Sequence, residues 1–348
     1  MKKHETAITI GIPAYQRPEY TRLAVESCLN QNYSNYNILL QDDSPDGELA
    51  ELLRGFSSPR FAYAHNPQRL GLARNANVIL EKARGTWMLF LANDDLLEPG
   101  YLAALNDIIS KYPEAALIRT RYRLISTRGQ SLRLDRKNPF REDALGFLEH
   151  LFLPLTDSSL MNISAVAFPT ENFRKIGGFK DLHGGHHIDR LAWAGLAQFG
   201  DVLCIPDPLA RIRVHPGQLS IAPDIDYPAA LRANRDMENC FEEIFRRFSA
   251  RDDPARGVEH LAQVRSRFQH YCRRQNQRAL DQGLCAAIET RKIRSVKDLR
   301  TALSAVRKHG IPFFPSLLFY QCLLLLPSGL RTSCLKTFKQ IKFKRWFT

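Results

Sequence analysis

The stretch Gly85–Pro99 holds the residues whose chemistry is easiest to interpret. Trp87–Leu91 is a continuous apolar run, typical of a strand buried on both faces of a parallel sheet, and it leads to Asn93, Asp94 and Asp95. Adjacent carboxylates at the end of a buried strand repel each other unless a cation compensates them. Because hard divalent ions prefer carboxylate oxygens, the pattern predicts a metal site that holds a phosphorylated ligand. The alternative is an Asx-rich turn that opens the next helix.

Two earlier strands also end in polar residues. Ala7–Ile12 leads to Tyr15 and Tyr36–Gln41 leads to Asp43, and each strand is followed by a segment with helical spacing of apolar residues. Strands that alternate with helices predict a doubly wound, mostly parallel α/β sheet, whose right-handed crossovers place the strand ends along one edge. We therefore expect Tyr15, Asp43 and Asn93–Asp95 to converge on one site.

The remaining elements follow from the same patterns of apolar residues. Further strands are predicted over Phe61–His65, Ala115–Ile125, Ser164–Phe168 and Asp201–Ile205. After the second strand, a helix capped by Ser44 or Asp46 is predicted to run through Phe56. The other predicted helices are Pro18–Leu29, Leu72–Ala83, Glu171–Ile176, Leu191–Phe199, Tyr227–Phe248 and Val258–Thr290.

The net charge of +13 is concentrated in the C-terminal part of the chain. From Arg291 onward, 13 Lys and Arg residues stand against one acidic residue, a net charge of +12 that leaves +1 for the first 290 residues. A uniformly basic nucleic-acid-binding protein would not show this asymmetry, so no nucleic-acid partner is predicted. Seven scattered cysteines without a CxxC pair indicate a reduced, cytosolic setting, and no signal peptide is expected.

Four motifs together resemble glycosyltransferase family 2. They are Ile10-Gly-Ile-Pro-Ala-Tyr, Gln41-Asp-Asp-Ser, Arg74-Asn75 and Phe90-Leu-Ala-Asn-Asp-Asp, in the family's order and at its usual intervals. The resemblance covers roughly residues 6–220. It implies a GT-A fold, a nucleotide-sugar donor, a divalent metal ion (Mn²⁺ or Mg²⁺) and inversion at the sugar carbon.

The resemblance also implies a role for each motif residue. The implied nucleotide contacts are Pro13, Ala14, Tyr15, Arg17, Asp43, Arg74, Asn93 and Asp94. Asp43 would accept the base imide N–H and Asp94 a ribose hydroxyl, because a carboxylate is an acceptor only. Asp95 would bind the metal ion that bridges the phosphates, and His215, in the family's closing segment, would approach the metal or the diphosphate.

The phrase Gly177-Gly-Phe-Lys is followed in the family by an acidic residue that opens a helix and acts as the catalytic base. Asp189 matches that residue and would deprotonate the acceptor hydroxyl. An N-cap is its alternative role. His183, His186 and His187 match no zinc spacing and are interpreted as residues of an acceptor-binding loop.

Several residues depart from the family pattern or have a simpler interpretation. Gln16 stands where the family often has Asn, Ala92 replaces a further Asp, and Ile188 replaces a Glu. Tyr15 could be a packing residue at a strand end, and Arg74 a solvated arginine on a helix face. The losses at Ala92 and Ile188 keep open a degenerate homologue that scaffolds a membrane complex. A nucleotidyltransferase is the other alternative, but Pro13-Ala-Tyr-Gln is not its Gly-rich phosphate loop.

The chain is predicted to comprise two domains. Residues 1–222 would form the catalytic domain, with a nucleotide-binding half over about 1–112 and an acceptor half over about 113–222, and 223–348 a helical, basic C-terminal region. Within the latter, Ile311–Leu330 lacks charge but contains three prolines, so we interpret it as a shallow membrane segment or a packed core helix. The cationic residues after it indicate binding to a membrane surface. We expect a peripheral enzyme on the cytoplasmic face that glycosylates a lipid-linked or cell-surface polysaccharide acceptor.

Overall fold

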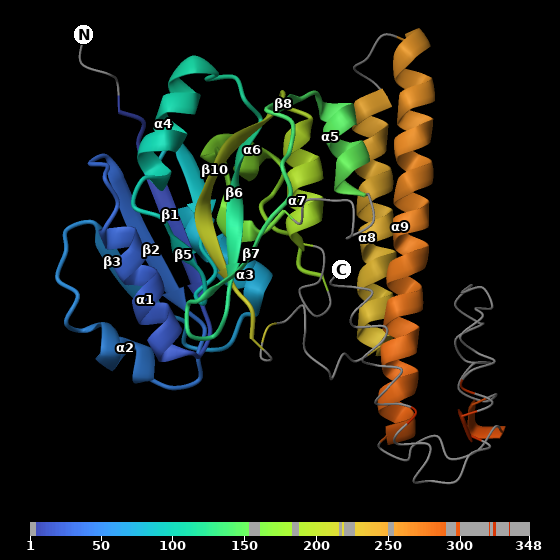
Figure 1. Cartoon of the computed structure of the whole chain (residues 1–348), viewed down its shortest axis with the longest axis horizontal. Coiled ribbons are helices and arrows are strands. Elements are labelled where there is room, and N and C mark those ends of the chain that lie inside the picture. The colour runs from blue at the N-terminus through green and yellow to red at the C-terminus, as the bar shows by residue number, and fades with distance from the viewer. Residues whose placement is uncertain are drawn as a thin grey trace.

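The computed structural model describes residues 5–152, 161–182, 188–215, 218, 227–249 and 254–289, together with 297–299, 320, 323, 324 and 334. The strands are β1 (Ile8–Ala14), β2 (Tyr36–Asp42), β3 (Phe61–His65), β4 (Trp87–Phe90), β5 (Leu96–Leu97), β6 (Leu117–Ile125), β7 (Ser131–Leu134), β8 (Arg141–Glu142), β9 (Val166–Pro169) and β10 (Val202–Arg213). The helices are α1 (Pro18–Leu29), α2 (Glu48–Leu53), α3 (Leu72–Lys82), α4 (Tyr101–Lys111), α5 (Ala144–Leu151), the 3₁₀ helix η1 (Ile163–Ala165), α6 (Thr170–Lys175), α7 (Ile188–Ala197), α8 (Tyr227–Ser249) and α9 (Pro254–Glu289). An α/β unit thus precedes two long helices (Figure 1).

The strands form one mixed sheet in the order β3-β2-β1-β4-β9-β6-β10-β5, with β7 paired to β6 and β8 to β10. The pairs β3–β2, β2–β1, β1–β4 and β6–β10 are parallel, whereas β9 is antiparallel to both of its neighbours. The predicted mostly parallel sheet flanked by helices is confirmed. The antiparallel direction of β9 could not be predicted from its short apolar run, because strand direction depends on the path of the preceding loop.

Close packing at the centre of the sheet explains the apolar runs. All seven residues of β1 and all four of β4 are buried. A Cβ added to Gly11 would lie 2.7 Å from Cγ2 of Ile79, so the glycine lets α3 approach β1 closely. At the carboxyl end of β1, the Ala14 carbonyl accepts a hydrogen bond from Nδ2 of Asn75, in the first turn of α3, at 3.4 Å.

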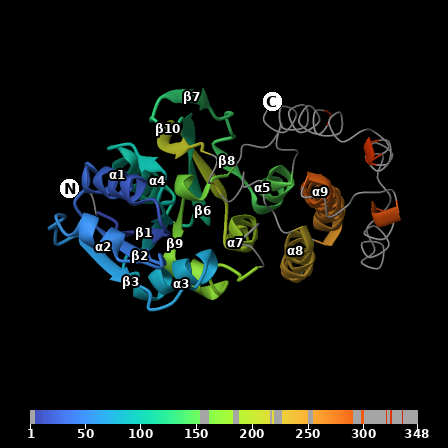
Figure 2. The same ribbon diagram turned by 90° about the horizontal axis from the view of Figure 1, so that it is seen from below.

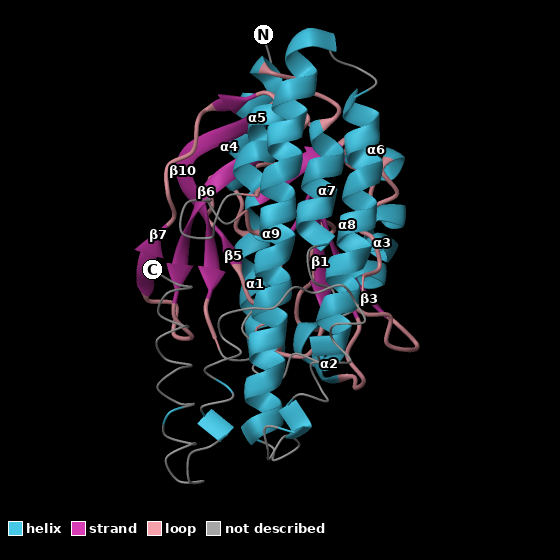
Figure 3. Cartoon of the chain, turned by 90° about the vertical axis from the view of Figure 1, so that its right-hand side faces the viewer, coloured by secondary structure: helices cyan, strands magenta, loops and turns pink. Residues whose placement is uncertain are grey.

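Two hydrophobic cores cover the two faces of the sheet. One contains residues of α1, α2 and α4, and the other contains residues of α3, α5, α6 and α7. The second core continues into α8 and α9, where Phe152 packs against Phe241 and Phe268 with ring centroids 4.7 and 5.1 Å apart. In Figure 2, α5 and α7 lie between the sheet and the α8–α9 pair, and Figure 3 shows α8 and α9 side by side on the outside.

Three local predictions differ from the structure. Neither Ser44 nor Asp46 is the N-cap of α2, which is Gly47; the Ser44 hydroxyl accepts a hydrogen bond from the amide of Gln16, and Oδ1 of Asp46 accepts the Glu48 amide at 3.4 Å. The last strand extends to Arg213, and its register shifts on both sides of Pro208, where proline cannot donate to the ladder. Helix α7 begins at Ile188, one residue before Asp189.

Some predictions fall outside the described residues. They concern His183, His186 and His187, almost all of Ile311–Leu330, and the cationic residues from 331 to 348. Among the helices that the structure does describe, none combines the length and the apolar character needed to cross a bilayer. The boundary predicted at residue 222 also lies in a segment that is not described.

Candidate functional site

Hydrogen bonds join the carboxyl ends of β1, β2 and β4 into one site. The amide of Gln16, after β1, donates to Oγ of Ser44, after β2, at 2.7 Å. The side-chain amide of Asn93, after β4, donates to the Gln16 carbonyl at 3.1 Å and to the Thr21 hydroxyl at 2.9 Å. Parallel strands predict this convergence. The Asn93 side chain links the loop after β4 to the loop after β1 and to the first turn of α1.

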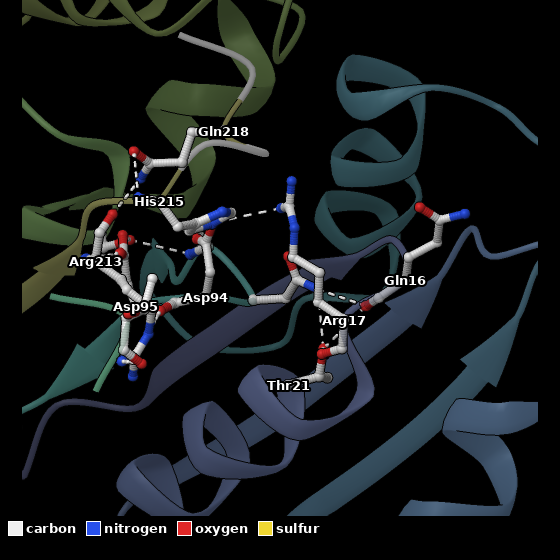
Figure 4. Close-up of polar contacts among 12 residues, drawn as sticks. Gln16, Arg17, Thr21, Asp94, Asp95, Arg213, His215 and Gln218 are labelled. Carbon is white, nitrogen blue, oxygen red and sulfur yellow. Dashed lines mark hydrogen bonds and ion pairs between the residues drawn. The ribbon is translucent and has the colours of Figure 1, made fainter. Parts of the chain in front are cut away.

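The turn after β1 has an unusual backbone. Gln16 and Arg17 have φ angles of 55° and 57°, the left-handed region that residues other than glycine seldom adopt. Neighbours hold this conformation, since the Thr21 hydroxyl and amide both donate to the Arg17 carbonyl at 3.0 Å. The turn directs the Arg17 guanidinium to Asp94, with Nη1 and Oδ2 3.3 Å apart (Figure 4).

Asp43 fixes the loop that precedes α3. Its buried carboxylate accepts hydrogen bonds from the amides of Leu70 and Gly71 at 2.7 and 2.8 Å and from Nδ2 of Asn66 at 2.9 Å. Asn66 also donates to Oδ1 of Asn75, whose own amide donates to the Gln41 carbonyl. A carboxylate offers about four acceptor positions, so the three protein donors leave room for about one more.

The other candidate nucleotide contacts differ in exposure. Pro13 and Ala14 are buried strand residues in register with Gln41 and Asp42, and their side chains point to opposite faces of the sheet. Tyr15 is half-buried, and the Arg69 guanidinium carbon lies 4.4 Å from its ring centroid. Arg74 is exposed and pairs with Asp181 at 2.6 Å.

Asp94 accepts hydrogen bonds from two side chains far apart in the sequence. Besides Arg17, His215 approaches it, with Nε2 2.8 Å from Oδ2, and Figure 4 shows both side chains directed at this carboxylate. The Tyr20 and His215 rings lie 5.5 Å apart between centroids. His215, predicted as a metal residue, thus contacts Asp94 and not Asp95.

Asp95 is more deeply buried and has neutral partners. Oδ1 accepts the Arg213 amide at 2.8 Å and Oδ2 accepts the Ser164 hydroxyl at 2.6 Å. Burial, and then the neighbouring charge of Asp94, raise the pKa of Asp95 well above its ordinary value. Neither carboxylate caps the next helix, whose N-cap is Gly100, so the turn-and-cap alternative does not account for the pair.

Arg213 and Ser164 were missed by sequence reasoning. The buried Arg213 guanidinium donates to the carbonyls of Asp94, Ser126 and Thr127 and lies 4.5 Å over the ring of Tyr20. Ser164 also accepts the Ala92 amide at 3.0 Å. Only the closeness of Arg213 to His215 in the sequence could have drawn attention to it, and Ser164 carries no signal at all.

The carboxylates of Asp94 and Asp95 suit a divalent cation whose coordination is completed by a phosphorylated ligand and water. Within the described ranges, no three His, Cys, Asp or Glu residues are grouped closely enough to hold a metal ion by themselves. Mg²⁺ is commonly held by one or two carboxylates together with substrate phosphates and water. Two adjacent buried carboxylates fit that arrangement, since burial and then the charge of Asp94 raise the pKa of Asp95.

Asp189 lies in the first turn of α7 and is partly buried. Its Oδ1 accepts the Arg190 amide at 2.7 Å. The Arg190 guanidinium carbon lies 4.9 Å from the ring centroid of Tyr271 on α9. Burial raises the pKa of Tyr122, the charges of Asp135 and Asp95 raise it further, and those of Arg133 and Arg190 lower it.

Comparisons with known proteins agree with this geometry. Residues 9–168 match the model of the family Glycosyl transferase family 2. Protein CgeD of Bacillus subtilis is 24% identical over 214 residues, which are 58% of this chain and 49% of CgeD. An uncharacterized glycosyltransferase of Haemophilus influenzae is 33% identical over 92 residues, 26% of this chain and 37% of that protein. The chain thus spans less than half of the length of these curated relatives.

Solved structures share the fold. Residues 1–349 of S. aureus TarS in complex with UDP-GlcNAc superpose with a TM-score of 0.57 at 16% identity, over 80% of this chain and 81% of that one. The mannosyltransferase PcManGT from Pyrobaculum calidifontis, in complex with GDP-Man and Mn²⁺, gives a TM-score of 0.52 at 13% identity, over 92% and 84% of the two chains. Such distant likeness establishes the fold, and the matched segment contains all three strand ends of the site. Residues 9–168 of this chain therefore carry the sequence pattern of glycosyl transferase family 2.

Proposed function

We propose that this protein is an inverting glycosyltransferase that moves a sugar from a nucleotide-sugar donor to a lipid-linked or cell-surface polysaccharide acceptor. The observation that supports it best is the convergence of Tyr15, Asp43 and Asn93–Asp95 at one sheet edge within a family 2 domain. TarS and PcManGT, which share the fold, bind UDP-GlcNAc and GDP-Man respectively.

We propose a UDP- or dTDP-linked donor, because uracil and thymine both carry an imide N–H. The acceptor position that remains on Asp43 could receive it, beside the half-buried ring of Tyr15. Asp94 would receive a ribose hydroxyl in competition with Arg17. Arg74, held at the surface by Asp181, would have to leave that ion pair to reach a phosphate.

A divalent cation, Mn²⁺ or Mg²⁺, would neutralise the departing nucleoside diphosphate. Asp95 is its proposed protein ligand, and His215 would adjust the position of Asp94 through their 2.8 Å contact. Asp189, in the first turn of α7, is the proposed base for the acceptor hydroxyl. We place the enzyme on the cytoplasmic face of a membrane, with the basic C-terminal residues as one anchor.

Thermal unfolding with a panel of nucleotide sugars tests the donor assignment. With Mn²⁺ present, we expect a uridine or thymidine diphosphate sugar to raise the unfolding midpoint and to be consumed, and GDP-sugars to do neither. Asp43→Asn should lose this response, whereas Asp46→Asn, an exposed carboxylate on the same loop, should keep it. If no nucleotide sugar is bound or consumed under any metal condition, the enzymatic proposal fails and the scaffold alternative stands.

A further inference from the structure

The surface formed by residues 126–141, which contains β7, combines exposed apolar and cationic side chains. Four large apolar residues are exposed in the described part of the chain, and three of them lie here: Leu132 at 57%, Leu134 at 38% and Phe140 at 45% exposure. Leu132 and Leu134 lie on β7, and Phe140, whose ring centroid is 5.6 Å from that of Tyr112 at the C-cap of α4, follows them in the same segment. Large apolar side chains left exposed within one segment mark a candidate interaction surface. We call residues 126–141 the β7 surface.

The exposed charges of the β7 surface are all positive. Arg128, Arg133, Arg136 and Lys137 are exposed on it, as is Arg141, which pairs with Asp201. The one acidic residue between 126 and 141, Asp135, is 9% exposed and accepts hydrogen bonds from Arg121 and the Tyr122 amide. The surface therefore presents cations beside apolar groups and offers no exposed carboxylate of its own.

The shape of the segment suits contact with a broad surface. Every residue of β7 is exposed, and β7 pairs with β6 alone among the described strands. Figures 2 and 3 place β7 at the periphery of the sheet, away from α8 and α9. A register shift next to Ile125 and the charged side chains oppose pairing with a further strand.

The β7 surface is tied directly to the candidate site. Nη1 of Arg213 donates to the carbonyls of Ser126 and Thr127, each at 3.1 Å, and Nε of the same side chain donates to the Asp94 carbonyl at 2.9 Å. One buried side chain thus fixes both the start of this surface and the carboxylate turn. A partner bound here would lie beside the site where a donor sugar is held.

We propose that the β7 surface docks on an anionic lipid bilayer. Leu132, Leu134 and Phe140 would enter the boundary between headgroups and acyl chains, and the arginines and Lys137 would contact anionic headgroups. A soluble polyanion would satisfy the cations but leave the apolar side chains in water, and a second copy of the chain would bring like charges together. The docking itself does not depend on the proposed function, which only explains why it would be useful for a lipid-linked acceptor.

Vesicle flotation of the full chain measures this docking. Phosphatidylcholine vesicles with and without phosphatidylglycerol would be compared for wild type, Arg128→Glu/Lys137→Glu and Leu132→Ser/Leu134→Ser. Each cation near an anionic surface contributes about fivefold in binding, so the charge-reversal pair should weaken partition by at least roughly 30-fold. Arg54→Glu/Arg84→Glu, two exposed arginines elsewhere with the same change in net charge, should have little effect.

Hydrogen exchange locates the contact independently of the C-terminal basic residues. Anionic vesicles should slow exchange of the amides between 126 and 141 in wild type and not in the two β7 variants, while nucleotide-induced stabilisation stays equal in all of them. Flotation that is equal for all variants would overturn the proposal. So would protection of 126–141 by soluble polyphosphate but not by vesicles, or by raised protein concentration alone.

Discussion

At the scale of single residues, the two carboxylates after β4 differ in what surrounds them. Asp94 faces the cationic Arg17 and the imidazole of His215, whereas Asp95 is 1% exposed and receives only the Arg213 amide and the Ser164 hydroxyl. Burial and then the charge of Asp94 raise the pKa of Asp95, although the hydrogen bonds from Ser164 and from the Arg213 amide, and the charge of Arg213, oppose the shift. The arrangement therefore stores an electrostatic cost at Asp95 that a bound cation would relieve.

Asp95→Asn should abolish metal-dependent nucleotide binding and sugar transfer while leaving the fold intact. The amide keeps the shape and removes one of two like charges, so the apo protein should be as stable as wild type or slightly more stable. Calorimetric titration with nucleotide and Mn²⁺ measures the binding, and thermal unfolding without metal measures the stability. Transfer by Asp95→Asn that equals wild type, with metal added or chelated, would refute the metal assignment.

Asp189→Asn tests the proposed base. The amide retains most of the hydrogen-bonding capacity at the first turn of α7 but cannot take a proton, so turnover should fall by roughly two to four orders of magnitude. Donor affinity should not change. Parallel measurements of donor binding and of single-turnover transfer separate the two effects, and a joint loss of both would make Asp189 a structural residue.

At the scale of elements, the bounds of a strand can be predicted from the sequence better than the residues that surround the strand in the fold. Phe61–His65 has the bounds of β3, because an apolar run between turn residues is a local signal. Because Pro206 and Pro208 resemble the end of a strand, the predicted strand stops at Ile205, whereas β10 continues to Arg213. The partners of Asp95 were not predictable, since Ser164 and Arg213 lie 69 and 118 residues away from it along the chain.

A gap along β6 separates β9 from β7. β9 pairs with β6 at Ile118 and Arg119, β7 pairs from Arg123 onward, and Asp135 fills part of the space between them with one oxygen, Oδ2, left without a partner among the described residues. Burial raises the pKa of Asp135 to about 6 from its ordinary 3.8, although the Tyr122 amide and Arg121 oppose the shift. A carboxyl group that prefers its proton in the folded state makes stability depend on pH.

Asp135→Asn should remove a decline in stability that wild type shows as the pH rises from 3.8 to about 6. In this window folded Asp135 holds a proton that the unfolded chain has released, so the free energy of unfolding falls with increasing pH and levels off above the folded pKa. Urea unfolding of both proteins across the window gives the difference, in which other carboxylates cancel. A difference that rises in favour of wild type toward pH 6, or none at all, would contradict this account.

At the scale of the whole molecule, α8 and α9 share a core with the α/β unit. Phe241, Phe245 and Phe268 are almost fully buried and join Phe152 in the cluster that also contains Trp193 of α7. Arg190, next to Asp189, lies against Tyr271 of α9. Helices α8 and α9 therefore support α7, which carries the proposed base Asp189. Removal of α8 and α9 should destabilise the α/β unit that contains the candidate site.

Phe268→Ala should destabilise the entire described fold by roughly 3–5 kcal/mol, because it opens a cavity among aromatic rings of both parts. The neighbouring exposed Gln269→Ala is the matched control and should have almost no effect. Far-ultraviolet circular dichroism reports all helices, while near-ultraviolet signals include those of the buried Trp87 and Trp193 of the α/β unit. If the parts form one cooperative unit, both signals move together to lower urea in Phe268→Ala. If instead α8 and α9 fold as a separate domain, the far-ultraviolet signal splits into two transitions, and the tryptophan transition keeps its wild-type midpoint.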